Sequence, residues 1–314
     1  MAFGDRDMTH RNPYPEAVVG GDRTYEIHEA ARLTGLAPAR LRAWERRYAV
    51  VRPARQPNGY RAYTAEQVAL LRAFARLIEG GERIGDLALQ PIEEVVNRSE
   101  ARDIDDSSHG ALLAAVVSFD RDRLETLVGE QVRIRGLGGF AHEVVLPLAQ
   151  VVGDLWALGK IPVAAEHMAS EVVVHALKAG LREARGTGFV CLAACIPGER
   201  HEWGFLASLT DVQELGWQVH YLGPDLPVDD VVEAAWKRQA RSVAFSGSDP
   251  RLVEPQLPAL TQLPARLPPR AFAVIGGGGV APFEHILRSA GYRIGLESFS
   301  SPVPDTPVHG VVGT

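Results

Sequence analysis

Cysteine is scarce in this chain of 314 residues and occurs only as Cys191 and Cys195. On a strand, these two residues would lie roughly 13 Å apart at about 3.3 Å per residue. A disulfide requires Cα atoms within about 7 Å of each other. We therefore expect two buried thiols, and a reducing cytoplasm as the place where the protein works.

Long apolar runs are also missing. None reaches the roughly 18 residues that a membrane span requires, so we expect no membrane partner. The segment 1–22 has no apolar core of a signal peptide and is expected to be a disordered leader. Hydrophobic residues make up 46% and charged residues 23% of the chain, which is typical of a globular protein with two or three domains.

Negative charge dominates the chain as a whole, but not its beginning. The formal net charge is −6, yet residues 23–63 contain nine arginines against three glutamates. This segment therefore carries +6 and leaves −12 for the remainder. A basic segment on an acidic body favours a nucleic-acid partner for that segment alone.

The basic segment has the pattern of two short helices joined by a tight turn. Thr24 is a candidate N-cap of the first helix, and Thr34-Gly35-Leu36 forms the turn. Pro38 opens the second helix. This helix carries four arginines suited to a DNA groove and its phosphates, namely Arg40, Arg42, Arg46 and Arg47.

A basic hairpin follows in RPARQPNGYRAY (52–63), where Asn58-Gly59 is a strong turn signal. The candidate DNA contacts of this wing are Arg55, Asn58, Tyr60 and Arg61. A single arginine-rich helix is often merely solvated, but helix, turn, helix and wing together favour DNA binding. From Tyr25 through NGYRAY and into the next helix, the segment resembles the DNA-binding domain of MerR-type regulators, which dimerise on pseudo-palindromic sites.

The middle of the chain has helical periodicity. In FAHEVVLPLAQVVGDLWALGK (140–160), Pro147 is expected to kink the helix. The helix that begins at Pro162 has an expected inward stripe of Val163, His167, Ser170, Val174, Leu177 and Leu181, with Glu166 at its border. A polar pair on a buried face requires a partner or a ligand. The alternative is a satisfied core histidine beside a surface glutamate.

The last third alternates short apolar runs with helical stretches, which predicts a doubly wound α/β sheet of parallel strands. Ligands of such sheets bind beyond the carboxyl ends of the strands. Four loops leave strands at that end: PGERHEWG (197–204), GPDLP (223–227), SGSDP (246–250) and GGGGVAP (276–282). The four glycines would let a large ligand approach bare backbone. They do not form GxGxxG, and no P-loop lysine is present, so a nucleotide is not the first choice.

The loop after the first of these strands carries ExHxxG at Glu199, His201 and Gly204. This is similar to the DxHxxG motif of cobalamin-binding domains, whose histidine replaces the cofactor's own base below cobalt. A neutral imidazole suits a borderline metal such as cobalt. The resemblance implies that His201 is the lower axial cobalt ligand and that Glu199, in place of the usual aspartate, is its hydrogen-bond partner. It also implies a slot for the nucleotide tail, lined by Ser246, Ser248, Gly276, Gly277 and Gly278.

A further resemblance concerns the helical middle. Trp156, Val163, Glu166 and His167 reproduce the W…EH pattern of the helical cap in the CarH photoreceptor group, which the chain resembles from about residue 23 to 300. In that group the cap covers the upper face of adenosylcobalamin. The resemblance implies that Trp156 and Val163 adjoin the adenosyl group, and that Glu166 and His167 hydrogen-bond this group or the corrin rim.

These resemblances imply a multidomain fold. A disordered leader (1–22) precedes a MerR-type winged helix-turn-helix domain (23–92). A four-helix-bundle cap (107–186) and a doubly wound, flavodoxin-like cobalamin-binding domain of the Rossmann-like class (187–300) follow. A tail (301–314) completes the chain.

The leading interpretation is a light-sensing transcriptional repressor that is not an enzyme. With adenosylcobalamin it would assemble into a dimer or tetramer and bind operator DNA, and light would release the DNA. The alternative is a regulator of the same build that senses cobalamin, or another tetrapyrrole such as haem, without a light response. A corrinoid-dependent methyl-transfer enzyme agrees poorly with the DNA-binding segment. A MerR-type metal sensor agrees poorly with the position of both cysteines.

One residue departs from the pattern of the CarH group. There the tryptophan is typically followed by a histidine, which takes the upper position on cobalt in the lit state. Here that residue is Ala157, which cannot ligate a metal. We expect photolysis to be retained, with His167, His142 or water in the vacated position.

Overall fold

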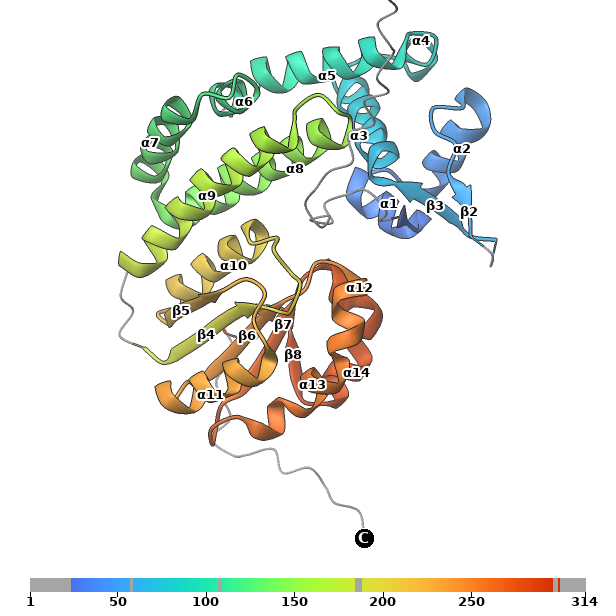
Figure 1. Cartoon of the computed structure of the whole chain (residues 1–314). Coiled ribbons are helices and arrows are strands. Elements are labelled where there is room, and N and C mark those ends of the chain that lie inside the picture. Colours follow the sequence, from blue (N-terminus) through green and yellow to red (C-terminus); the bar gives the residue numbers. More distant parts are fainter. Residues whose placement is uncertain (1–23, 57–58, 107–108, 184–187, 296–298, 300–314) are drawn as a thin grey trace, which may run out of the picture. The chain divides into compact units, whose positions relative to one another are not determined.

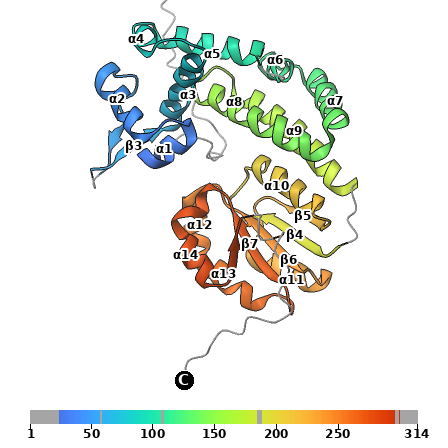
Figure 2. The same cartoon turned by 180° about the vertical axis from the view of Figure 1, so that it is seen from behind.

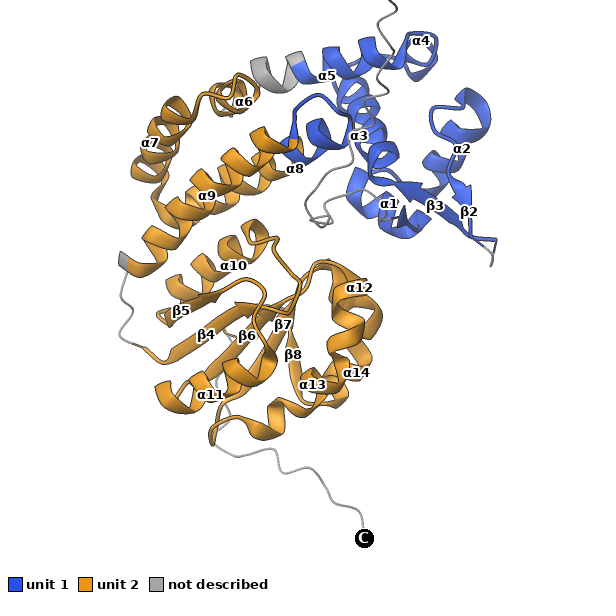
Figure 3. Cartoon of the chain, in the orientation of Figure 1, with its two compact units in different colours: residues 1–107, 152–162 blue, residues 108–151, 163–314 orange. Residues whose placement is uncertain are grey.

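The computed structural model describes residues 24–56, 59–106, 109–183, 188–295 and 299. The expected leader and tail lie outside these residues. By contact, the chain groups into two compact units, of which the first comprises 1–107 with 152–162 and the second 108–151 with 163–314 (Figure 3). The domain boundaries expected from the sequence stay a prediction. No helix among the described residues has both the length and the apolar composition of a membrane span.

The first unit begins as a winged helix-turn-helix, as predicted (Figure 1). Its helices are α1 (Ile27–Thr34), α2 (Pro38–Tyr48), α3 (Ala65–Glu79), α4 (Ile84–Leu87) and α5 (Ile92–Asp106). The strands β1 (Thr24–Tyr25), β2 (Ala54–Arg55) and β3 (Arg61–Thr64) form an antiparallel sheet in the order β1-β3-β2. The last two are the strands of the predicted wing.

Local sequence signals explain these boundaries. Gly35 ends α1 with φ 68°, a left-handed conformation that favours glycine. Pro38 stands in the first turn of α2, where its missing N–H is not needed. Thr64 and Gln67 form a capping box at the start of α3. The turn and both helices are therefore specified by short-range chemistry.

Thr24 does not cap α1, so that prediction was wrong. It lies in β1, paired with Thr64 of β3. Glu26 occupies the N-cap position and makes no side-chain cap bond. The extended backbone of an N-cap threonine suits a strand equally well, and β-branched residues are common in strands.

A buried ion pair fixes residues 152–162 within the first unit. Asp154, near the end of α8 (Leu146–Ala157), is 4% exposed. Its two carboxylate oxygens accept from Arg72 at 2.6 Å and from Arg76 at 2.8 Å, both on α3. The Nε of Arg72 also donates to the carbonyl of Leu33, in α1, at 2.7 Å. This stretch of α8 is thereby joined to the helix-turn-helix.

The second unit starts with helices, which include α6 (Gly110–Val117), α7 (Arg121–Gly139), a π-helical segment η1 (Phe140–Val145) and α9 (Val163–Glu183). The helices α6, α7 and α9 contact one another. A kink was predicted at Pro147, and this position was wrong. The backbone breaks at Gly136, with φ 72° and ψ 175°. The wide π turns of η1 follow, so Pro147, which lacks an N–H donor, stands in the first turn of α8.

The predicted inward stripe of α9 was wrong at Val163 and His167 but right at Leu177 and Leu181. The side chain of His167 is 58% exposed, and Val163 is 49% exposed. The buried residues of α9 are Ala165, Met168, Ala169, Val172, Val173, Leu177 and Leu181. Apolar residues occur around most of this helix, so the 3.6-residue period alone allowed more than one inner face. A core histidine at position 167, the alternative reading, is excluded as well.

The remainder of the second unit is a parallel sheet with helices on both faces, as predicted. Its strands are β4 (Val190–Cys195), β5 (Gln218–Gly223), β6 (Ser242–Ser246), β7 (Phe272–Gly276) and β8 (Tyr292–Ile294). Their spatial order is β5-β4-β6-β7-β8, which is the flavodoxin-like 2-1-3-4-5 arrangement. The chain order therefore reverses between β4 and β6.

Helices and short turns connect the strands: α10 (Trp203–Glu214), α11 (Val228–Arg238), α12 (Pro250–Val253), η2 (Glu254–Gln256), α13 (Leu257–Gln262), η3 (Pro264–Arg266), η4 (Gly278–Phe283) and α14 (Glu284–Ser289). The helices α11, α13 and α14 share one apolar core with the sheet. Figure 2 shows α10 on the opposite face, between the sheet and α9. A contact between α9 and α10 joins the helical part of this unit to the sheet.

Candidate functional site

Three strands of the sheet end at the same level. In the parallel register, Cys195 pairs with Ser246, and Ser246 pairs with Gly276. The loops that follow β4, β6 and β7 therefore start side by side at the carboxyl end of the sheet. This end adjoins the switch point between β4 and β6, where flavodoxin-like folds bind their ligands.

The loop after β4 places His201 against a buried carboxylate. The Nδ1 of His201 lies 2.7 Å from Oε1 of Glu199, whose side chain has no exposed surface. The backbone N–H of His201 donates to the same oxygen at 2.8 Å. The other oxygen, Oε2, accepts from the backbone N–H and hydroxyl of Ser248, at 2.6 and 2.5 Å. Three residues predicted from the sequence thus meet in one hydrogen-bonded group.

This group controls the protonation of Glu199 and the tautomer of His201. Burial by itself raises the pKa of Glu199, but the hydrogen bonds from His201 and Ser248 outweigh it and hold the pKa at about 2. A carboxylate that stays ionised keeps the proton of the imidazole on Nδ1. Nε2 is then the nitrogen with a lone pair for a metal, and 46% of the imidazole side chain is exposed.

The glycines of the loop after β7 allow this loop to pack closely against the loop after β6. A Cβ added to Gly277, whose φ is 102°, would lie 2.3 Å from the carbonyl oxygen of Gly247. A Cβ on Gly279 would lie 2.5 Å from the backbone of Asp249. By contrast, a Cβ on Gly276 or Gly204 would meet nothing within 4 Å. Close backbone packing therefore explains Gly277 and Gly279, and open space beside the backbone remains at Gly276 and Gly204. Gly278 begins η4.

Glu166 and His167 of α9 belong to a hydrogen-bonded series that reaches the His201 loop. Glu166 accepts from His167 Nδ1 at 2.7 Å through one oxygen and from the Ser170 hydroxyl at 2.8 Å through the other. The hydroxyl of Ser170 in turn accepts from Nε1 of Trp203 at 3.1 Å. We call the series Trp203–Ser170–Glu166–His167 the α9 chain. Trp156 lies in the first unit, so its predicted role stays a prediction.

Sequence reasoning missed a second link between α9 and this loop. Lys178 lies 2.6 Å from Oε1 of Glu202, and the hydroxyl of Tyr221 donates to the same oxygen at 2.8 Å. The hydroxyl of Tyr221 also lies 3.4 Å from the sulfur of Cys195. Burial raises the pKa of both groups, that of Cys195 to about 12. The acidic and basic side chains within 199–203 suggest that this loop forms ion pairs, but the sequence does not identify partners on another helix.

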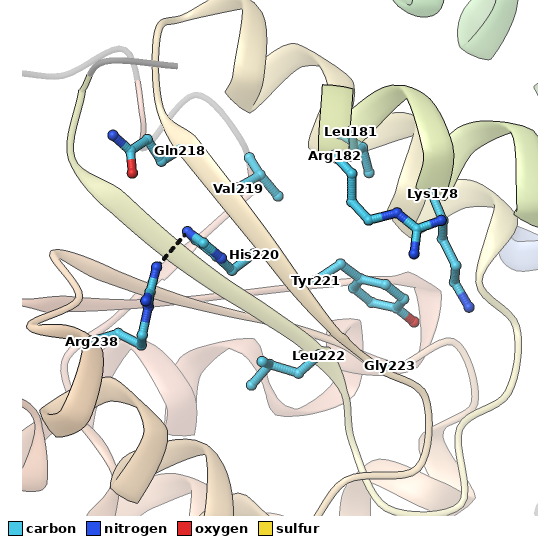
Figure 4. Close-up of a pocket in the computed structure, with 10 residues that line it drawn as sticks. All are labelled: Lys178, Leu181, Arg182, Gln218, Val219, His220, Tyr221, Leu222, Gly223 and Arg238. Carbon is cyan, nitrogen blue, oxygen red and sulfur yellow. Dashed lines mark hydrogen bonds between the residues drawn. The ribbon is translucent and has the colours of Figure 1, made fainter. Parts of the chain in front are cut away.

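A cavity of about 790 Å³ lies beside this link, along the edge strand β5. Figure 4 shows Lys178 and Arg182 of α9 beside Tyr221, while Arg238 reaches His220 at 3.2 Å. None of its ten lining residues is among the predicted cofactor contacts. The predicted cofactor contacts therefore do not line this cavity.

The predicted DNA-contacting arginines differ in their surroundings. Arg40, Arg42, Arg46, Arg47 and Arg55 are exposed, and Tyr60 is 61% exposed. Arg61 instead donates to Glu45 of α2 at 2.7 Å, and Tyr63 also hydrogen-bonds this carboxylate. Arg61 thus links the wing to α2, and its DNA contact stays a prediction. Arg55 donates to the carbonyl of Gly59 across the turn at 3.2 Å, and Asn58 lies outside the described residues.

Two segments of the chain match known protein families. Residues 25–88 match the MerR HTH family of regulatory proteins, and residues 110–179 match the B12 binding domain. The HTH-type transcriptional repressor CarH of Myxococcus xanthus is 34% identical over 278 residues, covering 83% of this chain and 90% of that protein. The HTH-type transcriptional repressor CarA of the same organism is 30% identical over 288 residues, covering 88% and 91%.

Among solved structures, the chain partly matches the monomethylamine corrinoid protein of Methanosarcina barkeri. It is 20% identical, with a TM-score of 0.43, and the match covers 60% of this chain and 93% of that one. The two repressors are matched over nearly their whole length. The chain belongs to the family of MerR-type transcriptional repressors with a B12 binding domain that includes CarH and CarA.

Proposed function

We propose that this protein is a repressor that binds operator DNA when it holds adenosylcobalamin and releases the DNA in light. The observation that carries the proposal is a hydrogen-bonded group at the carboxyl ends of the strands, in which buried Glu199 bonds Ser248 and the half-exposed His201. It fits an axial metal ligand, because a second-shell carboxylate that holds Nδ1–H leaves Nε2 to coordinate. Among the described residues, no group of three or more His, Cys, Asp or Glu side chains is arranged to hold a metal ion. In the proposed complex, the corrin would supply the other ligands of cobalt.

The residues around this group are suited to a corrinoid. Gly204 and Gly276 have open space beside the backbone, and Ser246 and Ser248 lie at the end of β6 and in its loop. With Gly277 and Gly278, they would line the slot for the nucleotide tail. Trp156, Val163, Glu166 and His167 would contact the upper face. Bound adenosylcobalamin would supply a cobalt–carbon bond that light can cleave.

The first unit would supply the DNA contacts. The five exposed arginines of α2 and the wing are Arg40, Arg42, Arg46, Arg47 and Arg55. They form the electrostatic footprint that phosphate binding requires. Regulators of this type present such units in pairs or higher multiples, and we propose a dimer or tetramer that forms with the cofactor. A regulatory role rather than methyl-transfer catalysis is supported by the two repressors to which the chain is similar.

The structure favours His167 over His142 as the side chain that replaces the missing histidine at Ala157. His142 lies on η1, with Nε2 2.7 Å from Asp211 in α10. Asp211 is about 12 Å along α10 from Trp203, at a rise of about 1.5 Å per residue. The Nδ1 of His167 is held by Glu166, and more than half of its side chain is exposed. Coordination by water is the remaining alternative.

One experiment tests the proposal most directly. Purified protein is loaded with adenosylcobalamin in the dark, bound to operator DNA, and followed by absorption and DNA retention before and after illumination. We expect loss of DNA together with the spectral change of photolysis. A His201→Ala variant should bind the cofactor much more weakly or with an altered spectrum, whereas unchanged binding would contradict the lower ligand.

Variants at the two histidines identify the group that holds the lit state. His167→Ala should change the lit spectrum, while His142→Ala should leave it unchanged. A lit spectrum insensitive to both substitutions would indicate water. If the DNA complex survives complete photolysis, light is not the signal, and a sensor of cobalamin or another tetrapyrrole replaces this proposal.

A further inference from the structure

The His201 loop is held from outside the sheet by two bonds to α9. Directly after His201, Glu202 pairs with Lys178, and Trp203 donates to the hydroxyl of Ser170. The side chain of Glu202 is 13% exposed and that of Lys178 is 30% exposed, so this ion pair is partly shielded from water. Shielding strengthens such a pair relative to a fully exposed one.

The two bonds act at widely spaced points of one rigid helix. Ser170 and Lys178 are eight positions apart on α9, or about 12 Å at a rise of about 1.5 Å per residue. Their partners, Glu202 and Trp203, are adjacent in the chain. A shift of α9 along its axis in either direction therefore lengthens at least one bond. The position of α9 and that of the His201 loop are coupled.

The α9 chain is also directional. The indole N–H of Trp203 donates to Ser170, and the hydroxyl of Ser170 donates to Glu166. The proton of Ser170 is therefore committed to Glu166. If Glu166 turned toward another donor, Ser170 would lose its acceptor and its bond to Trp203 would weaken, because linked hydrogen bonds polarise one another.

We propose that Ser170 and Lys178 are positioning residues for His201 and couple the lower ligand to the upper-face residues Glu166 and His167. This inference rests on the proposed function for the roles of those three residues. The coupling requires no contact between the two faces through the cofactor. It runs through α9 and the first turn of α10, so a change at Glu166 alters the loop that holds His201.

The first test uses the protein without cofactor. Amide hydrogen exchange is measured at His201 and Ser248, whose N–H groups both donate to Glu199. We expect Ser170→Ala and Lys178→Met to speed exchange about fivefold, the factor that corresponds to a net hydrogen-bond contribution near 1 kcal/mol. Ser170→Thr should restore slow exchange. Arg182→Met is the matched control, because Arg182 lies one turn further along α9 and lines the same cavity as Lys178.

The second test reads the cobalt ligand directly. Protein whose histidines carry nitrogen-15 is loaded with cob(II)alamin and examined by electron paramagnetic resonance, in which a labelled histidine ligand and the unlabelled base of the cofactor split the cobalt lines differently. Ser170→Ala, Lys178→Met and Glu166→Ala should each lower the ratio of histidine-ligated to unligated cobalt about fivefold. Ser170→Thr and Arg182→Met should match the wild type. Thermal unfolding verifies that every variant is folded.

The outcomes separate this inference from the proposed function. If the wild type shows no labelled histidine nitrogen on cobalt, the lower-ligand proposal fails, and amide exchange still decides whether α9 positions the loop. If the wild type is histidine-ligated but Ser170→Ala and Lys178→Met leave both readouts unchanged, the inference is overturned. An equal effect of Arg182→Met also overturns it, since a general loss of positive charge then explains the data.

Discussion

Glu199 is a carboxylate without exposed surface that accepts hydrogen bonds from two backbone N–H groups, one imidazole and one hydroxyl. Its pKa of about 2 lies below the ordinary value of 4.5, so folding favours the ionised form. The stability that follows is fully present above about pH 4.5. It is lost as the pH falls toward 2.

The expected size of this contribution is roughly 3 kcal/mol, at about 1.4 kcal/mol per pKa unit. Urea unfolding of the wild type between pH 7 and pH 3 should show the loss. Glu199→Gln should be less stable at pH 7, and the difference from the wild type should shrink in acid. A constant difference across this range would show that ionisation of Glu199 does not contribute.

Arg46 and Arg61 were both predicted to contact DNA, but their substitution should have different effects on DNA binding and on stability. Arg46 is exposed, so Arg46→Ala should reduce the slope of log affinity against log salt by about 1 and leave stability unchanged. Arg61→Ala leaves Glu45 without its ion pair and should lower the free energy of unfolding by about 1–2 kcal/mol. DNA titrations at several salt concentrations and urea unfolding of both variants separate the two roles. Equal salt slopes of the two variants would contradict the assignment of different roles to Arg46 and Arg61.

Individual site residues were predictable where a short motif specifies them. Glu199, His201 and Ser248 were identified from their loops, and the structure brings them together. Glu202 and Trp203 were not identified, because their partners lie on α9 and depend on how that helix packs. The predicted inward orientation of His167 was wrong for the same reason. Apolar residues surround α9, so only tertiary contacts determine which face of this helix is buried.

The loops after β6 and β7 pack backbone against backbone, and this predicts unequal effects of neighbouring glycines. Gly277→Ala must adopt φ near 102° and meet the Gly247 carbonyl, so it should destabilise the second unit by more than about 1 kcal/mol. Gly276→Ala meets nothing within 4 Å and should leave stability nearly unchanged. Under the proposed function, Gly276→Ala weakens cofactor binding instead. Thermal unfolding and cobalamin titration of both variants test this; equal loss of stability would contradict it.

The ion pair between α8 and α3 predicts a large effect from one carboxylate. Asp154→Ala removes the carboxylate that Arg72 and Arg76 share, and their side chains are only 14% and 21% exposed. We expect a loss of about 3 kcal/mol in the free energy of unfolding of the first unit. Glu125→Ala, which removes the exposed pair with Arg121, is the control and should cost about 0.3–0.5 kcal/mol. Similar losses in urea unfolding would mean that burial of Asp154 adds nothing.

The order of the elements was largely predictable, and their details were less so. Alternating apolar runs and helical stretches predicted the parallel sheet, and turn signals predicted the helix-turn-helix and wing. The break at Gly136 and the π turns of η1 were not predicted, because proline is the stronger local signal and stood at Pro147. The attachment of residues 152–162 to the first unit depends on Asp154, a contact 78–82 positions away in sequence that no local pattern reveals.

Cofactor-driven assembly is the prediction for the intact molecule. Several DNA-binding units in one oligomer raise the effective concentration of each unit at its half-site and so strengthen binding. Light scattering should therefore give a larger mass for the dark adenosylcobalamin form than for the apoprotein. Illumination should return the mass toward that of the apoprotein. Identical masses in the dark would contradict assembly by the cofactor.

The membership of residues 152–162 in the first unit makes the DNA-binding body discontinuous in sequence. A fragment ending at residue 107 would lack Asp154, and with it the acceptor of Arg72 and Arg76. Exchange of DNA-binding parts between relatives through a single junction would therefore separate α3 from its own partner. Recombination that preserves function requires two junctions, or a matching aspartate already present in the recipient. The DNA-binding segment is thus joined through this ion pair to a stretch that lies inside the B12 binding match of residues 110–179.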